Sequence, residues 1–206
     1  PVRNDKGEWL RVQLHTPETL WVRVWQAQIG RIKLYLLDSN DPVNHPVDRC
    51  ITTKLYGGGL EHRLSQEILL GIGGWRVLRA LGITPDVCHL NEGHTAFLVL
   101  ERARDLMSEH NLDFKTALSV TRAGNLFTTH TPVEAGFDQF SPQLIRNYLG
   151  FYVQKLGIDI ETLLDLGRNP YSKNPDSSFN MAYLAIHGSA AINGVSRLHS
   201  AVSRGI

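Results

Sequence analysis

The sequence is poor in cysteine, carries no excess of charge and contains no long apolar run. Two of its 206 residues are cysteines, Cys50 and Cys88, a number typical of free, buried or half-buried thiols in a reducing cytosol. Twenty-one basic residues against twenty acidic ones give a net charge of +1, so no basic field is present to hold nucleic acid or an anionic membrane. No apolar run reaches the roughly 18 residues of a transmembrane helix. We therefore expect a cytoplasmic globular protein with neither a nucleic-acid nor a membrane partner.

The chain also lacks the marks of a natural beginning. Its first residues, PVRNDKGEW, include no methionine and no apolar core of a signal peptide. The sequence opens in the middle of a pattern, which suggests a part of a longer protein. Its length nevertheless suffices to bury a core without disulfide or metal support.

The first forty residues alternate apolar and polar side chains, which is the period of a β-strand. The alternation covers Trp9–Leu14, Leu20–Ile29 and Arg31–Leu37, with Gly30 between the last two runs. Two alternating runs around one glycine predict a β-hairpin near the start of the chain.

After residue 60 the pattern changes to helices separated by short apolar runs. The runs Pro85–Leu90 and Ala123–Thr128 predict buried strands, and Ser141 followed by Pro142 predicts the start of a helix. Strands that alternate with helices indicate an α/β fold with a parallel sheet. The expected helices are Glu61–Leu81, Thr95–His110, Phe114–Arg122, Ser141–Lys155, Ile160–Leu166 and Phe179–Ser196.

Polar clusters follow both predicted strands of the parallel sheet. Asn91, Glu92 and His94 come after the first strand, and His130 and Thr131 come after the second. Ligands of parallel sheets bind beyond the carboxyl ends of the strands, so these side chains are candidates to hydrogen-bond sugar hydroxyls. The competing interpretation is structural: Asn91 would cap the next helix, and Glu92 would meet its dipole.

Three other patterns are candidates for functional sites. The order of His89, Glu92 and His94 superficially resembles a zinc signature, but its spacing does not place two imidazoles on one helix face, so we expect no metal. The glycines 57–59 precede a helix and are compatible with a gate over a site or with a plain linker. The Gly71–Gly74 segment follows no strand, so it is read as a place of close helix packing.

These clusters, in this order, resemble the α-glucan phosphorylases that act on glycogen, starch and maltodextrin, above all their short bacterial and archaeal type. The resemblance covers about residues 30 to 200. Its stretches are LYLLDSNDPVNHPVDRCITTKLYGGGLEHRLSQEILLGIGGWRVLRALGI, PDVCHLNEGHTAFLVLERAR, LFTTHTPVEAGFDQF and FNMAYLAIHGSAAINGVSRLHS.

The resemblance implies a fold, a reaction and a cofactor. The fold is part of the N-terminal Rossmann-like domain of the two-domain GT-B glycosyltransferase architecture. The reaction is cleavage of the terminal glucose of an α-1,4-glucan or maltooligosaccharide by inorganic phosphate, which gives α-glucose 1-phosphate. The cofactor is pyridoxal 5′-phosphate, held by a lysine of the C-terminal domain.

The resemblance also assigns roles to single residues. His130 matches the catalytic histidine that contacts the transferred glucose, and Glu92 and His94 match residues of the pocket beside it. Asn91 and Thr131 complete the expected substrate-binding set. Gly57, Gly58 and Gly59 fall where the family has its gating loop.

The extent of the resemblance predicts that residues 1–206 form a single partial domain, the middle and end of the N-terminal domain. The C-terminal cofactor domain and its lysine would be absent, so we expect the chain alone to be inactive. A homo-oligomer is compatible with this assignment. Two alternatives stay open: a non-catalytic carbohydrate-binding domain derived from the same fold, and a GT-B glycosyltransferase that uses a nucleotide sugar.

Overall fold

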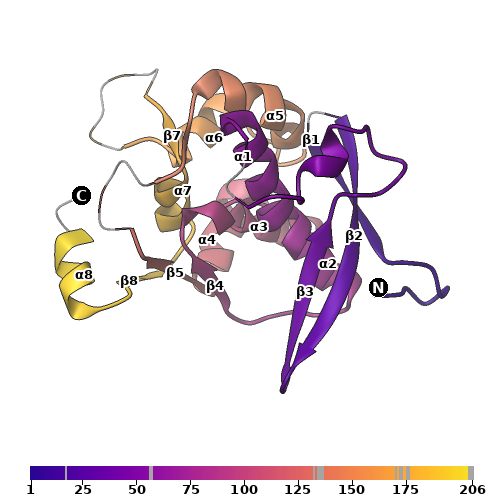
Figure 1. Cartoon of the computed structure of the whole chain (residues 1–206). Coiled ribbons are helices and arrows are strands. Elements are labelled where there is room, and N and C mark those ends of the chain that lie inside the picture. The colour runs from indigo at the N-terminus through magenta and orange to yellow at the C-terminus, as the bar shows by residue number, and fades with distance from the viewer. Residues whose placement is uncertain are drawn as a thin grey trace. The chain divides into compact units, whose positions relative to one another are not determined.

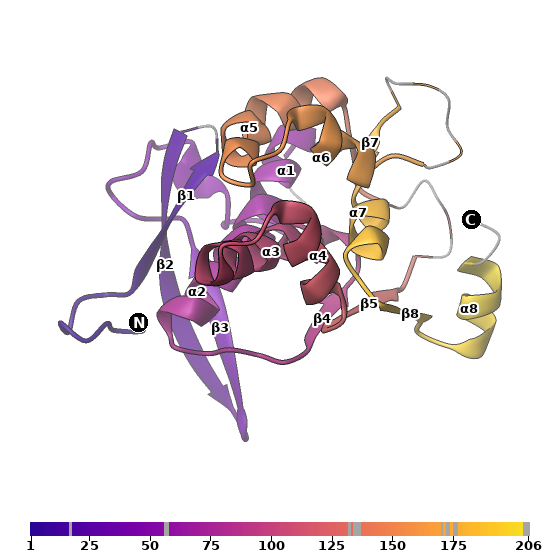
Figure 2. The ribbon, with the colours of Figure 1, turned by 180° about the vertical axis from the view of Figure 1, so that it is seen from behind.

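The computed structural model describes residues 1–16, 18–55, 58–131, 133, 137–169, 171, 174 and 177–203. Its internal contacts divide the chain into two compact units, Pro1–Thr84 and Pro85–Ile206. Figure 1 and Figure 2 show their elements from opposite sides.

The first unit contains a three-stranded antiparallel sheet in the order β1–β2–β3. Its strands are β1 (Arg11–Thr16), β2 (Glu18–Ile29) and β3 (Ile32–Asp38). Ile29 lies opposite Ile32, so β2 and β3 form the predicted hairpin around a two-residue turn. Gly30 in this turn has a φ of +59°, which a glycine adopts without strain.

The alternation in the sequence separates the two faces of this sheet. Val22 and Val24 are fully buried, and Leu14 and Leu20 face each other in the pairing of β1 with β2. The opposite face carries the tryptophans and charges. There, Arg23 binds Asp38 at 2.9 Å and lies over the ring of Trp9, while Trp25 Nε1 donates to the same carboxylate.

The helical part of the first unit differs in one detail from the predicted single helix. A short 3₁₀ turn, η1 (Asp48–Cys50), precedes α1 (Leu60–Ile68), and a π-helical turn, η2 (Leu69–Gly73), joins α1 to α2 (Gly74–Ala80). The expectation of close packing is confirmed at Gly73 but not at Gly74, where an added Cβ would meet nothing within 4 Å. A Cβ on Gly73 would lie 3.2 Å from Leu14 Cδ1, so the helix approaches β1 closely at this point.

The second unit is built on a parallel sheet in the order β4–β5–β8. The strands are β4 (Cys88–Asn91), β5 (Asn125–Thr129) and β8 (Ala191–Gly194). The mixed α/β fold with a parallel sheet and a hairpin is therefore confirmed. A two-stranded ribbon of β6 (Gln139–Phe140) and β7 (Phe179–Asn180) lies apart from this sheet.

Helices flank the parallel sheet, and several begin where the sequence predicts a cap. Ser141 accepts from the Leu144 amide with Pro142 in the first turn, as expected. Asp113 caps its helix in the same way, and its pKa is lowered mainly by the hydrogen bond from the Thr116 hydroxyl. The helical elements are η3 (Gly93–Thr95), α3 (Leu98–His110), α4 (Phe114–Arg122), α5 (Pro142–Gln154), α6 (Ile160–Leu166), α7 (Met181–His187) and α8 (Arg197–Ser203).

The prediction of one last helix over Phe179–Ser196 is wrong. The helix α7 ends at His187, and the following residues form β8, which pairs with β5. A Cβ on Gly188 would lie 2.5 Å from Val99 Cγ1, so the chain leaves the helix at a position that only glycine can occupy. The pairing joins residues more than sixty positions apart, and no local periodicity records it.

One face of the parallel sheet packs against helices. Leu90 and Phe127 are 1% exposed, and Arg102 of α3 donates to Asn125 Oδ1 at 2.5 Å and to the Gly124 carbonyl at 3.0 Å. Within α3, the buried Glu101 binds Arg104 and accepts from the hydroxyl of Tyr152 in α5 at 2.7 Å.

The two cysteines are free thiols. Cys88 is buried, as expected, and burial raises its pKa against the opposing charge of Arg102. Cys50 is exposed, which corrects the expectation of burial for that thiol. The cytoplasmic location inferred from cysteine usage stays a prediction. Among the described residues, no helix combines the length and apolarity needed to cross a membrane.

Candidate functional site at the ends of two parallel strands

The two polar clusters of the sequence meet at one edge of the parallel sheet. In the register of β4 with β5, Asn91 lies opposite Thr128. The Glu92 amide continues the ladder by donating to the Thr128 carbonyl at 3.0 Å. Both strands run in the same direction, so their following residues, Glu92 and His130, come together. The two clusters thus lie side by side beyond the carboxyl ends of the strands, as the sequence predicts.

Three hydrogen bonds join the clusters. His130 Nε2 lies 2.5 Å from Asn91 Oδ1. The backbone amide of His130 donates to Glu92 Oε1, and the Thr131 hydroxyl donates to the same oxygen at 3.0 Å. The side chains of Asn91 and Glu92 therefore bind the segment after β5 and cap no helix. The competing interpretation, in which Asn91 caps the next helix, is wrong, because η3 begins without a side-chain cap.

The cluster has polar groups that its internal hydrogen bonds do not use. His130 and Asn91 are exposed, and Glu92 is half-buried. Within the described residues, Glu92 Oε2, His130 Nδ1 and Asn91 Nδ2 have no hydrogen-bond partner. A carboxylate oxygen, an imidazole nitrogen and an amide NH₂ together accept and donate hydrogen bonds. This combination suits the hydroxyl groups of a sugar.

The remaining candidates lie around this cluster or in the other unit. His94 is half-buried in η3, two residues after Glu92. Among the glycines of the expected gating loop, Gly57 lies outside the described residues. Gly58 has a φ of +88°, and Gly59 is the residue before α1. Both belong to the first unit, and their role as a gate stays a prediction.

The sequence interpretation missed a row of hydrogen-bonded polar side chains on the face of the sheet that carries Asn91 and Thr128. His89 Nε2 lies 2.7 Å from Thr128 Oγ1, and this hydroxyl donates to Asn193 Oδ1 at 2.6 Å. This row of side chains crosses all three strands, β4, β5 and β8. The alternation of His89 with Asn91 in the first predicted strand was an available signal, whereas Asn193 was hidden by the wrong helix prediction.

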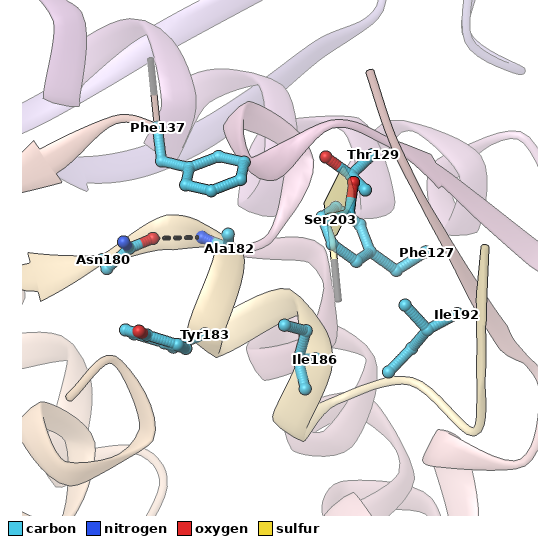
Figure 3. A pocket seen from close by; sticks show the side chains of 9 residues that line it. All are labelled: Phe127, Thr129, Phe137, Asn180, Ala182, Tyr183, Ile186, Ile192 and Ser203. Atoms are coloured by element: carbon cyan, nitrogen blue, oxygen red, sulfur yellow. Dashed lines mark hydrogen bonds between the residues drawn. The ribbon is translucent and has the colours of Figure 1, made fainter. Parts of the chain in front are cut away.

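The opposite face of the sheet borders an apolar cavity of about 120 Å³. Figure 3 shows Phe127 and Ile192 reaching it from the strands, Tyr183 and Ile186 from α7, and the ring of Phe137 from above. Thr129 of β5 also lines it. Because side chains alternate along a strand, Thr128 and Thr129 point to different faces. The cavity therefore lies on the opposite face of the sheet from Thr128 and from Asn193, to which Thr128 is hydrogen-bonded.

The described side chains fit neither a metal nor pyridoxal phosphate. Within the described ranges, no group of three or more His, Cys, Asp and Glu side chains is arranged to hold a metal ion. A lysine that forms a Schiff base with the cofactor lies in a desolvated pocket. The lysines of the described ranges are instead all exposed, namely Lys6, Lys33, Lys54, Lys115 and Lys155.

Comparisons with known proteins find relatives that are named glycogen or maltodextrin phosphorylases. It is 42% identical over 206 residues to the glycogen phosphorylase of Mycobacterium tuberculosis, an alignment that covers 95% of this chain and 23% of that protein. It is 42% identical to the maltodextrin phosphorylase of Thermococcus litoralis, with 99% of this chain and 24% of that protein covered. The glycogen phosphorylase of Aquifex aeolicus is 33% identical, with 98% and 29% covered.

The chain thus spans about a quarter of the length of these curated relatives. The sequence model of the family described as carbohydrate phosphorylase matches residues 83–204. This match covers more than half of the chain and includes β4, β5 and β8 with the polar cluster at their ends. The chain therefore belongs to the carbohydrate phosphorylase family.

Proposed function

We propose that this chain is part of an α-1,4-glucan phosphorylase. The parent enzyme would cleave the terminal glucose of a glucan or maltooligosaccharide with inorganic phosphate and release α-glucose 1-phosphate. The observation that carries the proposal is the cluster of Asn91, Glu92, His130 and Thr131 at the ends of β4 and β5. It lies within the stretch that matches the family, and its groups suit sugar hydroxyls.

In this proposal His130 is the catalytic residue of the chain. Its side chain and carbonyl contact the transferred glucose and favour the oxocarbenium-like transition state. Asn91, Glu92, His94 and Thr131 bind or orient the sugar from the same edge of the sheet. Hydrogen-bonding groups that are already fixed in place hold the sugar without rearranging during the reaction, which lowers the cost of reaching the transition state.

The pyridoxal phosphate of the family would be held elsewhere in the parent. The exposed lysines of the described ranges do not fit it. We further propose that β4–β5–β8 belongs to a Rossmann-like N-terminal domain of GT-B architecture. Residues 1–206 would form one partial domain of it, since the alignments to the relatives run across both compact units.

The test is an assay of glucose 1-phosphate release from maltodextrin and phosphate. It uses a protein of the relatives' length that carries this chain, with and without His130→Ala. We expect kcat to fall by about 100-fold or more, the loss typical of one preorganised group at a reaction centre. His110→Ala, at the exposed end of α3, is the matched control and should keep full activity.

Two outcomes contradict the proposal. One is the absence of glucose 1-phosphate from the complete wild-type protein, and the other is an equal loss in both histidine variants. The 206-residue chain alone is expected to be inactive, because part of the binding site and the cofactor would be missing. An NMR titration of this chain with maltooligosaccharide measures what binding the exposed cluster retains by itself.

A further inference from the structure

The backbone of Glu92 is held in a conformation that side chains rarely adopt. Its φ is +75° and its ψ is 169°, in a region populated almost only by glycine. The sequence has a glycine at the next position, but Gly93 serves another purpose. A Cβ on Gly93 would lie 3.2 Å from both the Ala182 amide and Met181 Cβ, where α7 packs against the turn. The backbone strain is therefore at Glu92, whose carboxylate accepts hydrogen bonds from His130 and Thr131.

Contacts on several sides hold Glu92 in place. Its amide donates to the Thr128 carbonyl at 3.0 Å, and its carbonyl accepts from the Thr95 hydroxyl at 3.0 Å. Its carboxylate accepts from the His130 amide and from the Thr131 hydroxyl. Both carboxylate donors come from the two residues directly after β5. The side chain of Glu92 thus fixes the backbone on which His130 is mounted.

Asn91 fixes the ring of the same histidine. Its side-chain oxygen lies 2.5 Å from His130 Nε2, and an amide oxygen can only accept a hydrogen bond. The proton of this bond is therefore on Nε2. In the neutral ring this leaves Nδ1 as an acceptor that has no hydrogen-bond partner among the described residues.

We propose that Asn91 and Glu92 are positioning residues that act through His130. Asn91 sets the tautomer and the direction of the ring, and Glu92 sets the peptide that carries it. Glu92 keeps its second carboxylate oxygen for the ligand. The identity of that ligand as a glucosyl unit rests on the proposed function. The positioning of His130 by Asn91 and Glu92, which we call the clamp, rests on the hydrogen bonds alone.

The same sheet supplies an internal control. His89 Nε2 is hydrogen-bonded to Thr128 Oγ1, and this hydroxyl donates its own proton to Asn193 Oδ1. A hydroxyl has one proton to donate, so His89 also carries its proton on Nε2. Both histidines are exposed, but His89 lies within β4, whereas His130 follows β5 and is bound by Asn91.

The first experiment records imidazole N–H signals of the ¹⁵N-labelled 206-residue chain by NMR at low temperature. In the wild type we expect protected Nε2–H signals from both His89 and His130. Asn91→Leu should remove the His130 signal and leave that of His89, whereas Asn91→Asp, which keeps an accepting oxygen, should retain both. Thr128→Val should have the opposite selectivity. A His130 signal that persists in Asn91→Leu, or that arises from Nδ1–H in the wild type, overturns the role of Asn91.

The second experiment measures hydrogen exchange at the His130 amide. Glu92→Ala should speed exchange at the His130 amide at least tenfold, with the amide of Phe127 in β5 as the internal reference. Glu92→Gln, which keeps an oxygen acceptor, should restore protection of the His130 amide. Glu92→Gly relieves the backbone strain but lacks the acceptor, so it should also lose protection. Equal protection in all four proteins overturns the role of Glu92.

In the complete enzyme, kcat should fall about 10- to 100-fold in Glu92→Ala, as expected for a displaced reacting group, and should be largely restored in Glu92→Gln. Equal kcat losses in the two variants contradict positioning and assign the charge itself to catalysis. A wild-type protein without phosphorolysis refutes the proposed function, while the NMR and exchange results still decide the clamp.

Discussion

The antiparallel sheet β1–β2–β3 and the parallel sheet β4–β5–β8 use their side chains for different purposes. In the antiparallel sheet, one face buries Leu14, Leu20 and Val22, and the other pairs tryptophans with charges. In the parallel sheet, one face packs on helices, but the other carries linked polar groups and ends in a strained carboxylate residue. Packing explains the residues of the first sheet, whereas the second keeps polar groups whose arrangement is costly and which packing does not require.

The largest effect is expected in the core of the antiparallel sheet. Leu14 is 1% exposed and lies against Leu20 and the glycine turn of η2. Leu14→Ala should lower the free energy of unfolding by about 3 kcal/mol, because it removes buried methyl groups and leaves a cavity. Urea denaturation measures the change. Leu36→Ala on β3, where the side chain is 47% exposed, should cost less than about 0.5 kcal/mol. Similar losses in both would contradict the assignment of the two faces.

A smaller effect is expected at Asp38, on the polar face of the same sheet. Burial raises the pKa of this carboxyl, but hydrogen bonds from Trp25, the Asn40 amide and Arg23 outweigh it, and the net pKa is lowered. Asp38→Asn should cost about 1–2 kcal/mol near neutral pH, since it removes charged hydrogen bonds.

The sign of the pH dependence follows from this lowered pKa. The contribution of Asp38 is fully present above the pKa of the unfolded carboxyl, about 3.9. It is lost as the pH falls through the lower folded value, because the unfolded state then binds more protons. The stability difference between the wild type and Asp38→Asn should therefore shrink between pH 5 and pH 3. Asp5→Asn, at an exposed position, is the control, and a difference that is constant with pH would refute the linkage.

The smallest effect, and the one that separates the two sheets, is expected at Glu92. Glu92→Gly should be about 1 kcal/mol more stable than Glu92→Ala, because glycine accepts a positive φ without strain. In an ordinary helix the order is reversed. Ser119 in α4 is the control, where the glycine variant should be about 1 kcal/mol less stable than the alanine variant. Thermal or urea unfolding of the four proteins gives the comparison, and the same sign at both positions would show that Glu92 is unstrained.

Most local elements could be predicted from the sequence. The hairpin around Gly30, the Ser141–Pro142 helix start and the two short strands of the parallel sheet are all present. Each depends on residues close in the chain, through alternation, capping or a permissive glycine. The candidate site could be located in the same way, since two polar clusters followed two strands that had to run parallel.

Other features could not be predicted. The π turn of η2 interrupts a helix whose apolar period continues through it, and β8 arises only by pairing with β5. The polar chain from His89 to Asn193 needed that third strand before it could be recognised. For β8 and for the linked side chains of His89, Thr128 and Asn193, the deciding contacts join residues far apart in the sequence.

The sequence by itself determined which side chains stand at the strand ends: an amide, a carboxylate, an imidazole and a hydroxyl. Only the tertiary structure decided what they do to one another. Asn91 and Glu92 reach across 39 and 38 positions to hold the ring and the amide of His130, and Glu92 adopts a strained backbone to do so. The physical reason is that hydrogen-bond geometry and backbone strain depend on how two strands pair, which local periodicity does not record.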